Sequence, residues 1–416
     1  MSSFLTQFFI RTLIPARKDA IIVPVRHPTA SDISKRKKQE KNMNEKELRE
    51  IKRRFRPDRS NIPNIVGCFI NSSGQIISRF NQSILLSEGD ESEELLSVMK
   101  KTLSGSLGTN LTDIEFSTRD VLEGEEHKLL TALRDSHLKD EAALSSFFAK
   151  VAESVHMESN YVVLLANDIY DVYTKESDEE SGSSTTFSYV VCSICPLKDS
   201  DAGLFFREAD KLFHSVTANA ILTRPVLGFM FPTFDDRMTN IYHALYYTKD
   251  ISSSNPEFVS RIFGKEAPMP PKVQRSAFSH CVSSALGEEC SFEVVKSVNM
   301  QIAEMVEEHK EMKIPEPLTL TKSTVRTLLS NCGVEEAKLD KVGEKLDESY
   351  GKNAELCPKN VVTTTRLDIQ LPDVKISVKK DKANLVSTQV IGGKKYIMIE
   401  ATEGVEVNGI PITISE

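Results

Sequence analysis

The chain has no apolar run long enough to cross a bilayer. Its longest clear run is 162–166, whereas a transmembrane helix needs about 20 consecutive apolar residues. The apolar segment 4–14 is also not typical of a secretory signal, because its positive charges (Arg11, Arg17 and Lys18) follow the apolar stretch instead of preceding it. We therefore predict a protein without a membrane span and outside the secretory pathway.

Strong catalytic and ligand motifs are also missing. The sequence contains no GxxxxGK[ST] phosphate-binding motif, and none of its dispersed histidines lies in an HExxH pattern. The stretch 104–108 (SGSLG) follows an expected helix, so its glycines are expected to form the helix exit and not a phosphate cradle. We predict no bound cofactor and nominate no histidine as catalytic.

Cysteine usage and net charge limit the class of protein. Seven cysteines is an odd number and does not suit a closed disulfide framework, so the reducing cytoplasm is the predicted location. The net charge of −8 argues against a surface that is basic throughout and coats nucleic acid, although local basic patches are compatible with it. A length of 416 residues predicts two or three domains.

The chain reads as if it begins twice. Asn44 followed by Glu47 has the form of a helix N-terminus, with Leu48, Ile51 and Phe55 on one face of the helix. The preceding segment 35–42 has neither apolar periodicity nor turn chemistry. We hypothesise that residues 1–42 are a mis-called or disordered extension of a bacterial gene and that the folded protein begins at Met43.

The pattern of residues 43–266 predicts an α+β domain with a mixed, largely antiparallel sheet, because several expected strand pairs are adjacent in sequence. An acidic, serine-rich segment at 175–184 is expected to be a solvated loop. The expected elements are a helix at 44–55, strands at 64–70 and 75–80, a helix at 95–103, a strand at 112–117, helices at 129–133 and 144–155, strands at 161–166, 170–174 and 187–194, a helix at 206–217, and strands at 226–231 and 242–248.

Proline-rich breaks at 267–271 and 313–317 divide the rest of the chain. They predict a helical segment at 267–314 and a C-terminal domain at 315–416, in which two helices lead into a small β module. The segments 391–394 (IGGK) and 407–410 (VNGI) are good hairpin turns. The expected elements are helices around 278–285, 294–306, 325–329 and 339–346, and strands at 361–369, 374–379, 385–391, 395–400 and 405–414.

The pair Cys192 and Cys195 has the spacing of a redox or zinc motif. Residues three apart in a strand point to opposite faces, however, and the chain has no second paired-cysteine motif to complete a zinc site. We predict two ordinary core cysteines.

Acidic residues follow two expected strands and form the candidate enzyme site. Carboxylates at strand ends often line clefts and can hold a divalent cation, but aspartate is also a common turn former. The candidates are Asp168, Asp171, Asp235, Asp236 and Arg237, with Asn167 beside them. They support the alternative hypothesis of an enzyme whose carboxylate or metal site is assembled from distant residues.

A basic run follows the first expected helix residues. Its members could contact a phosphate backbone, but Glu45, Glu47, Glu50 and Asp58 lie among them, as is typical of a solvated helix face. The candidate nucleic-acid contacts are Lys52, Arg53, Arg54, Arg56 and Arg59.

Several blocks of the sequence resemble the domain of unknown function 4317 family of uncharacterised bacterial proteins. The blocks are NEKELREIKRRF at 44, KTLSGSLGTNL at 101, LRDSHLKD at 133, YVVCSICPL at 189, GFMFPTFDDR at 228, ALYYTKD at 244, LPDVKISVKK at 371 and VEVNGI at 405. The resemblance implies a cytoplasmic protein without an assigned activity. It begins near Met43 and supplies no catalytic residues.

The leading hypothesis for function is a non-enzymatic binding or regulatory protein with a protein partner, since no nucleophile, base and oxyanion set converges in the sequence. The β-rich C-terminal part is the expected partner surface. A nucleic-acid binder is a further alternative, because the layout of the domains is similar to that of bacterial nucleoid-associated proteins.

Overall fold

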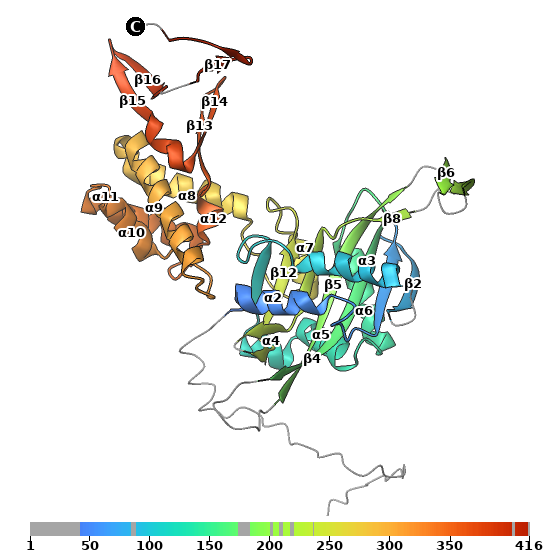
Figure 1. The fold of residues 1–416 in the computed structure, drawn as a ribbon. Coiled ribbons are helices and arrows are strands. Elements are labelled where there is room, and N and C mark those ends of the chain that lie inside the picture. Colours follow the sequence, from blue (N-terminus) through green and yellow to red (C-terminus); the bar gives the residue numbers. More distant parts are fainter. Residues whose placement is uncertain are drawn as a thin grey trace, which may run out of the picture. The chain divides into compact units, whose positions relative to one another are not determined.

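The computed structural model describes residues 42–84, 89–173, 184–199, 203–207, 211–216, 220–235, 237–401 and 404–414. Its main sheet has the order β2-β1-β4-β5-β9-β12-β3, with β8 beside β5, and each of these pairs is antiparallel (Figure 1). This confirms the α+β class. The strands are β1 (Asn64–Ile70), β2 (Ile76–Ser83), β3 (Leu111–Glu115), β4 (Tyr161–Tyr173), β5 (Ser184–Asp199), β8 (Ala220–Leu222), β9 (Leu227–Phe231) and β12 (His243–Thr248).

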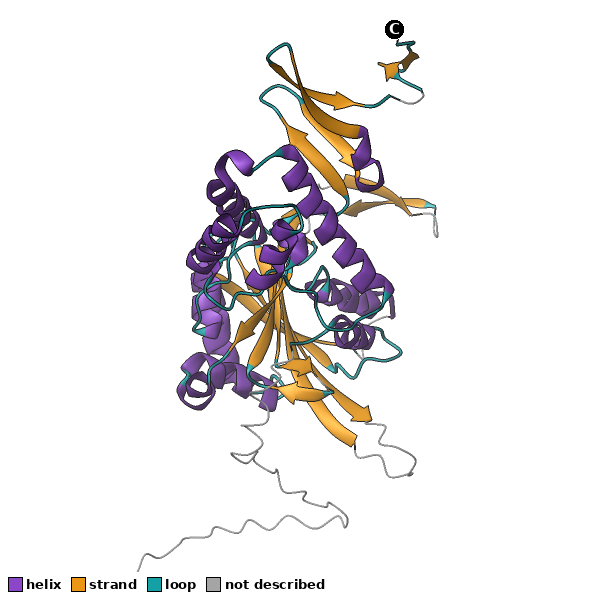
Figure 2. Ribbon diagram, turned by 90° about the vertical axis from the view of Figure 1, so that its left-hand side faces the viewer, coloured by secondary structure: helices purple, strands orange, loops and turns teal. Residues whose placement is uncertain are grey.

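Helices cover both faces of the main sheet (Figures 1 and 2). On one face lie α2 (Glu45–Arg54), α3 (Gly89–Lys100) and the short helix η1 (Lys101–Leu103). On the other lie α5 (Glu125–Asp135), α6 (Glu141–Ser154) and α7 (Pro256–Phe263), while α4 (Thr118–Glu123) precedes α5. Each face therefore has its own hydrophobic core.

The predicted start of the first helix is confirmed in detail. The Asn44 side chain accepts hydrogen bonds from the Lys46 and Glu47 amides, and the Glu47 carboxylate accepts one from the Asn44 amide at 2.9 Å. This reciprocal capping satisfies amides that have no partner within the helix. Leu48, Ile51 and Phe55 are buried, as their spacing predicts.

The central strand β4 corrects one prediction. The separate strands predicted at 161–166 and 170–174 are one strand, β4, which pairs with β5 from Tyr161 to Tyr173. Its apolar residues alternate between the two cores: Val163 and Leu165 face one, and Val162 and Leu164 face the other. Burial on both faces explains an unbroken apolar run. Thr174 and most of the predicted loop at 175–184 lie outside the described residues.

The helix predicted at 206–217 is wrong. The described residues of this region form an antiparallel hairpin of β6 (Gly203–Arg207) and β7 (Leu212–Val216), in register from Gly203 with Val216 to Arg207 with Leu212. Lys211, just before β7, has a φ of 58°, a left-handed conformation that does not continue a right-handed helix. Residues 208–210 and 217–219 lie outside the described residues. A second small hairpin, β10 (Thr233–Asp235) with β11 (Met238–Asn240), follows β9.

The predicted helices of the second half are present as α8 (Pro271–Leu286), α9 (Phe292–Glu311), α10 (Lys322–Ser330) and α11 (Glu336–Tyr350), with the short η2 (Gly287–Glu289) and α12 (Pro358–Val361). Buried residues from Phe278 to Val362 form one hydrophobic core shared by the four long helices. The strand predicted to begin at Val361 starts only at Arg366, because Val361 closes α12. The boundaries at 266 and 314 stay predictions, and residues 1–41 of the predicted extension lie outside the described residues.

The C-terminal β module consists of three two-stranded ribbons (Figure 2). They are β13 (Arg366–Gln370) with β14 (Lys375–Lys379), β15 (Val386–Ile391) with β16 (Lys394–Ile399), and β17 (Glu406–Val407) with β18 (Ile410–Pro411); η3 (Lys380–Leu385) joins the first two. The two predicted hairpin turns are confirmed, with positive φ at Gly392, Gly393, Asn408 and Gly409.

Candidate functional site

A buried ion pair joins the predicted basic run to the predicted acidic cluster. Arg54, at the end of α2, donates from Nε to Asp168 Oδ2 at 2.9 Å and from Nη2 to Asp168 Oδ1 at 3.1 Å. The Asp168 side chain is fully buried in β4, and the Arg54 side chain is 14% exposed. Two parallel bonds of this kind fix both groups in one geometry. The contact anchors the C-terminal end of α2 to the sheet.

Tyr189 on β5 completes this pair. Its hydroxyl donates to Asp168 Oδ2 at 2.8 Å, and the whole side chain is buried. Burial raises the pKa of Tyr189 well above its ordinary value, and the charge of Asp168 raises it further. Tyr189 therefore stays protonated at neutral pH, and its hydroxyl donates to and stabilises the carboxylate.

A second ion pair extends the network along α2. Glu50 Oε1 accepts a hydrogen bond from the Tyr170 hydroxyl at 2.5 Å, and Glu50 Oε2 lies 3.2 Å from Arg237 Nη1. The Arg54 guanidinium lies over the Tyr170 ring, 5.0 Å from its centroid. The charges alternate from Asp168 to Arg54 and from Glu50 to Arg237, so each cation has an anion beside it. We call these six residues (Glu50, Arg54, Asp168, Tyr170, Tyr189 and Arg237) the α2 network.

The other predicted acidic residues take separate positions. Asp171 is exposed and accepts a hydrogen bond from Thr186 Oγ1 at 3.1 Å. Asp235 accepts one from Asn240 Nδ2 at 2.5 Å within the β10–β11 hairpin. Asp236 lies outside the described residues. Asn167, adjacent to Asp168, is buried on the opposite face of β4, where its Oδ1 lies 3.0 Å from His137 Nδ1.

The predicted nucleic-acid residues also divide into groups. Arg54 points inward to Asp168, and Lys52 is half-buried, where burial lowers its pKa. Arg53 and Arg56 are exposed. Arg59 forms an exposed ion pair in which its Nε lies 3.6 Å from Asp58 Oδ2. The basic run is therefore part anchor and part solvent-facing surface.

The residues that sequence reasoning missed are Glu50, Tyr170 and Tyr189. Glu50 and Arg54 are four residues apart on α2 and so share a helix face, which was the one local signal for their common role. Their partners are more than 100 positions away along the chain. No local pattern identifies contacts of that separation.

The predicted core cysteines are confirmed as buried residues on opposite faces of β5. Cys192 belongs to one hydrophobic core and Cys195 to the other. Burial raises the pKa of Cys195 to about 12 and that of Cys192 well above its ordinary value. Both are held as neutral thiols, which are poor nucleophiles and poor metal ligands.

An open cleft of about 1770 Å³ runs along α2. Its lining comes mainly from α2 and the loop after it, the start of β3, the end of α9 with the segment that follows it to 319, and residues 355–359. Beside it, the buried amide of Asn360 donates to the Gly108 carbonyl at 2.7 Å, and Asn360 Oδ1 accepts from Thr109 Oγ1 at 2.8 Å. Small-molecule sites are usually about 300–1000 Å³ and mostly enclosed, so the cleft is larger and more open than such a site requires.

Exposed cations are frequent in this cleft. Eight lysines and arginines and six aspartates and glutamates line it, although the chain as a whole is acidic. Within the described ranges, six of the cations are exposed and form no ion pair: Lys46, Arg49, Arg53, Lys310, Lys313 and Lys359. We call them the cleft cations.

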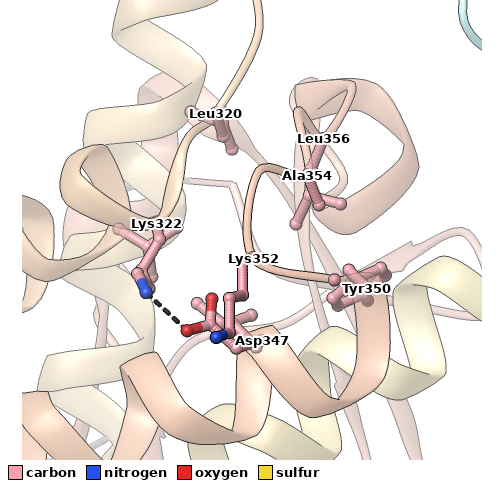
Figure 3. Close-up of a pocket in the computed structure, with 10 residues that line it drawn as sticks. Leu320, Lys322, Asp347, Tyr350, Lys352, Ala354 and Leu356 are labelled. Carbon is pink, nitrogen blue, oxygen red and sulfur yellow. Dashed lines mark hydrogen bonds and ion pairs between the residues drawn. The ribbon is translucent and has the colours of Figure 1, made fainter.

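The cavity drawn in Figure 3 is too small for a ligand. It lies between α10 and α11, beside the ion pair of Lys322 Nζ with Asp347 Oδ2 at 2.5 Å, and has a volume of about 10 Å³ (Figure 3). That volume holds one water molecule at most.

Two further features of the described residues bear on function. They contain no group of three or more histidine, cysteine, aspartate or glutamate side chains that could hold a metal ion. Every helix among them is too short or too polar to span a membrane.

Comparison with known proteins places the chain in a family. No curated protein matches it. The family model described as Domain of unknown function (DUF4317) matches residues 43–410, nearly the whole chain, and its first matched residue is the Met43 at which the resemblance begins. The chain belongs to the DUF4317 family.

Proposed function

We propose that the protein is a non-enzymatic binding protein and that the cleft along α2 receives a protein partner. The cleft carries the proposal, because its size and openness suit a macromolecular segment better than a small molecule. Its lining mixes cations, carboxylates and apolar residues such as Leu107, Ile314 and Leu318. Nucleic-acid surfaces are much more uniformly positive, so the mixture favours protein.

The α2 network supports a binding role in a second way. Asp168, Tyr189 and Arg54 satisfy one another and lie largely beneath the surface, so they hold α2 in place as one wall of the cleft. A preorganised wall reduces the entropic cost of binding. We also propose a cytoplasmic location, supported by the seven cysteines, all of which are free thiols.

Site-specific photo-crosslinking tests this proposal. A photoreactive residue replaces Ile314, which lines the cleft and is 42% exposed. The matched control replaces Leu122 on α4, which is 70% exposed and does not line the cleft. In source-cell extract, the Ile314 variant is expected to form a discrete protein adduct that the Leu122 variant lacks. Equal labelling of both variants, or labelling of neither, contradicts the proposal.

A nucleic-acid ligand is the second candidate, and the cleft cations favour it. Exposed lysines and arginines without ion-pair partners can neutralise phosphates and release counterions. Fluorescence anisotropy with generic DNA and RNA, single-stranded and duplex, at low and physiological salt tests it. Binding that weakens steeply with salt and is lost in Arg49→Glu/Arg53→Glu supports this candidate, whereas no binding at low salt removes it.

A further inference from the structure

The β15–β16 hairpin is anchored at its base and exposed beyond it. Val386, at the start of β15, is buried, and its carbonyl accepts a hydrogen bond from Lys296 Nζ on α9 at 3.0 Å. Further along, Val390, Ile391 and Ile399 are 64%, 51% and 54% exposed. An isolated two-stranded hairpin is marginally stable in water. The hairpin therefore presents apolar strand surface that nothing in the described chain covers.

The outer edge of β16 has free hydrogen-bonding groups. The amide of Glu400 donates to the Leu385 carbonyl at 2.8 Å, which continues the β15–β16 register by one pair. In an antiparallel pair, successive residues direct their N–H and C=O groups to opposite sides. Those of Lys395, Ile397 and Ile399 therefore point away from β15, and no described strand pairs with that edge. Such an edge is a template for another strand.

The charges along β16 specify which strand fits. Lys394 and Lys395 begin the strand, Glu400 follows its last residue, and four apolar residues lie between. An antiparallel copy of the same sequence places lysine opposite glutamate, whereas a parallel copy in register places lysine opposite lysine. Opposite charges in cross-strand pairs stabilise a sheet and like charges destabilise it. The sequence of this edge is complementary to itself.

We propose that β16 pairs with β16 of a second copy about a twofold axis at Ile397. Lys394 then faces Glu400 of the other copy, Lys395 faces Ile399, Tyr396 faces Met398, and Ile397 faces its own equivalent. The outward N–H and C=O groups of Lys395, Ile397 and Ile399 then bond to the same groups of the other copy. The register that places Lys394 opposite Glu400 is therefore also a register that satisfies the hydrogen-bonding groups of the edge. The product is a four-stranded antiparallel sheet with an isologous interface.

The other edge of the hairpin lacks this complementarity. The central residues of β15 are Ser387, Thr388 and Gln389, and the strand carries no charge to set a register. Between the two strands, the turn residues Gly392 and Gly393 adopt positive φ and fix the pairing of β15 with β16. The charged strand is therefore held in the register that directs Ile397 outward.

Disulfide trapping in the full chain tests the proposal. Directly paired residues of this type have Cα atoms about 5.5 Å apart, within the range that a disulfide spans. We expect Ile397→Cys to convert from monomer to a disulfide-linked dimer of doubled mass under mild oxidation. The control Val390→Cys lies on β15 and is well exposed; it and the unsubstituted chain, with its seven native cysteines, are expected to stay monomeric on a non-reducing gel.

A charge exchange provides the second arm, with sedimentation as its readout. The unsubstituted chain is expected to dimerise reversibly. The variant Glu400→Lys is expected to be monomeric, because lysine then faces lysine. The double variant Lys394→Glu/Glu400→Lys is expected to dimerise again, because it restores opposite charges in reversed order. A monomer at every concentration of the unsubstituted chain overturns the proposal and leaves a different protein as the occupant of this edge. Faster crosslinking at Val390 than at Ile397, or a dimer that Glu400→Lys leaves intact, also overturns it.

Discussion

The strands β4 and β5 and the strands β15 and β16 form antiparallel pairs of similar chemistry in different surroundings. Both pairs are rich in β-branched and aromatic residues, and both keep a continuous register. In β4, Val162–Ala166 is buried on both faces by two helical layers. In β16, Tyr396 and Ile399 are exposed to solvent.

The difference shows that strand pairing and strand burial have separate causes. Local sequence determines that a segment pairs, through propensity and turn chemistry. Burial depends on what the rest of the chain places over each face. The main sheet obtains its cover from α2, α3, α5, α6 and α7. Among the described residues, most of β16 stays exposed and no strand pairs with its outer edge, and we assign the pairing of that edge to a second copy.

The largest effect is expected from breaking the anchor of α2. Arg54→Ala leaves the buried Asp168 carboxylate without its cation, and breaking a buried pair in this way costs about 3–5 kcal/mol. The adjacent Arg53→Ala removes an exposed arginine, for which a change within about 0.5 kcal/mol is expected. Urea unfolding followed by circular dichroism measures both. Equal effects from the two variants would show that the network does not anchor the helix.

Truncation of one apolar side chain in each strand pair compares their burial directly. Leu165→Ala opens a cavity in a fully buried core and is expected to cost about 2–5 kcal/mol. Ile399→Ala removes exposed surface and is expected to change the free energy of unfolding by less than about 0.5 kcal/mol at concentrations where the chain is monomeric. A large loss of stability in the Ile399 variant under those conditions would mean that its own chain covers the strand.

A smaller effect is expected where the main sheet leaves no room for a methyl group. A Cβ atom at Gly228 would lie 2.2 Å from the Cys192 carbonyl oxygen, so Gly228→Ala forces the backbone apart at a cost of about 1–3 kcal/mol. Gly203 on the exposed β6 has no atom within 4 Å of the same position. Thermal unfolding is expected to distinguish Gly228→Ala from Gly203→Ala; matching melting temperatures would argue against the packing of β9 on β5.

The smallest effect concerns pH and the edge of the main sheet. Burial lowers the pKa of His243, but its 2.6 Å hydrogen bond to Asp113 and the negative charge there more than offset this, so the pKa is raised overall. The resulting stability is fully present below the unfolded pKa of about 6.5 and is lost as the pH rises through the folded value. We expect the free energy of unfolding to fall by roughly 1 kcal/mol as the pH rises through this range. Asp113→Asn should flatten the profile, and an unchanged profile would contradict the assignment.

The local parts of the fold were predictable from the sequence. Asn44 and Glu47 identify the start of α2 because both capping bonds are made within four residues. Paired glycines and an Asn-Gly sequence identify the turns before β16 and β18, because each needs left-handed backbone conformations. The opposite placement of Cys192 and Cys195 follows from the twofold period of a strand.

Prediction from local sequence patterns failed where contacts between distant residues determine the structure. The apolar residues of 206–217 fit a helix as well as a strand, and short apolar segments are ambiguous in this way. Asp168 was predicted as a candidate active-site carboxylate, yet its partner Arg54 lies 114 positions earlier in the chain. The cleft is likewise built from segments that no periodicity connects.

Hydrogen exchange on the intact protein tests most directly whether the exposed strand is completed by a second copy. The amides of Tyr396 and Met398 face β15, whereas those of Lys395, Ile397 and Ile399 face the outer edge. We predict that exchange of the three outer amides slows as protein concentration rises, while exchange in β4 does not change. Outer amides that exchange at the same rate at every concentration would contradict the account.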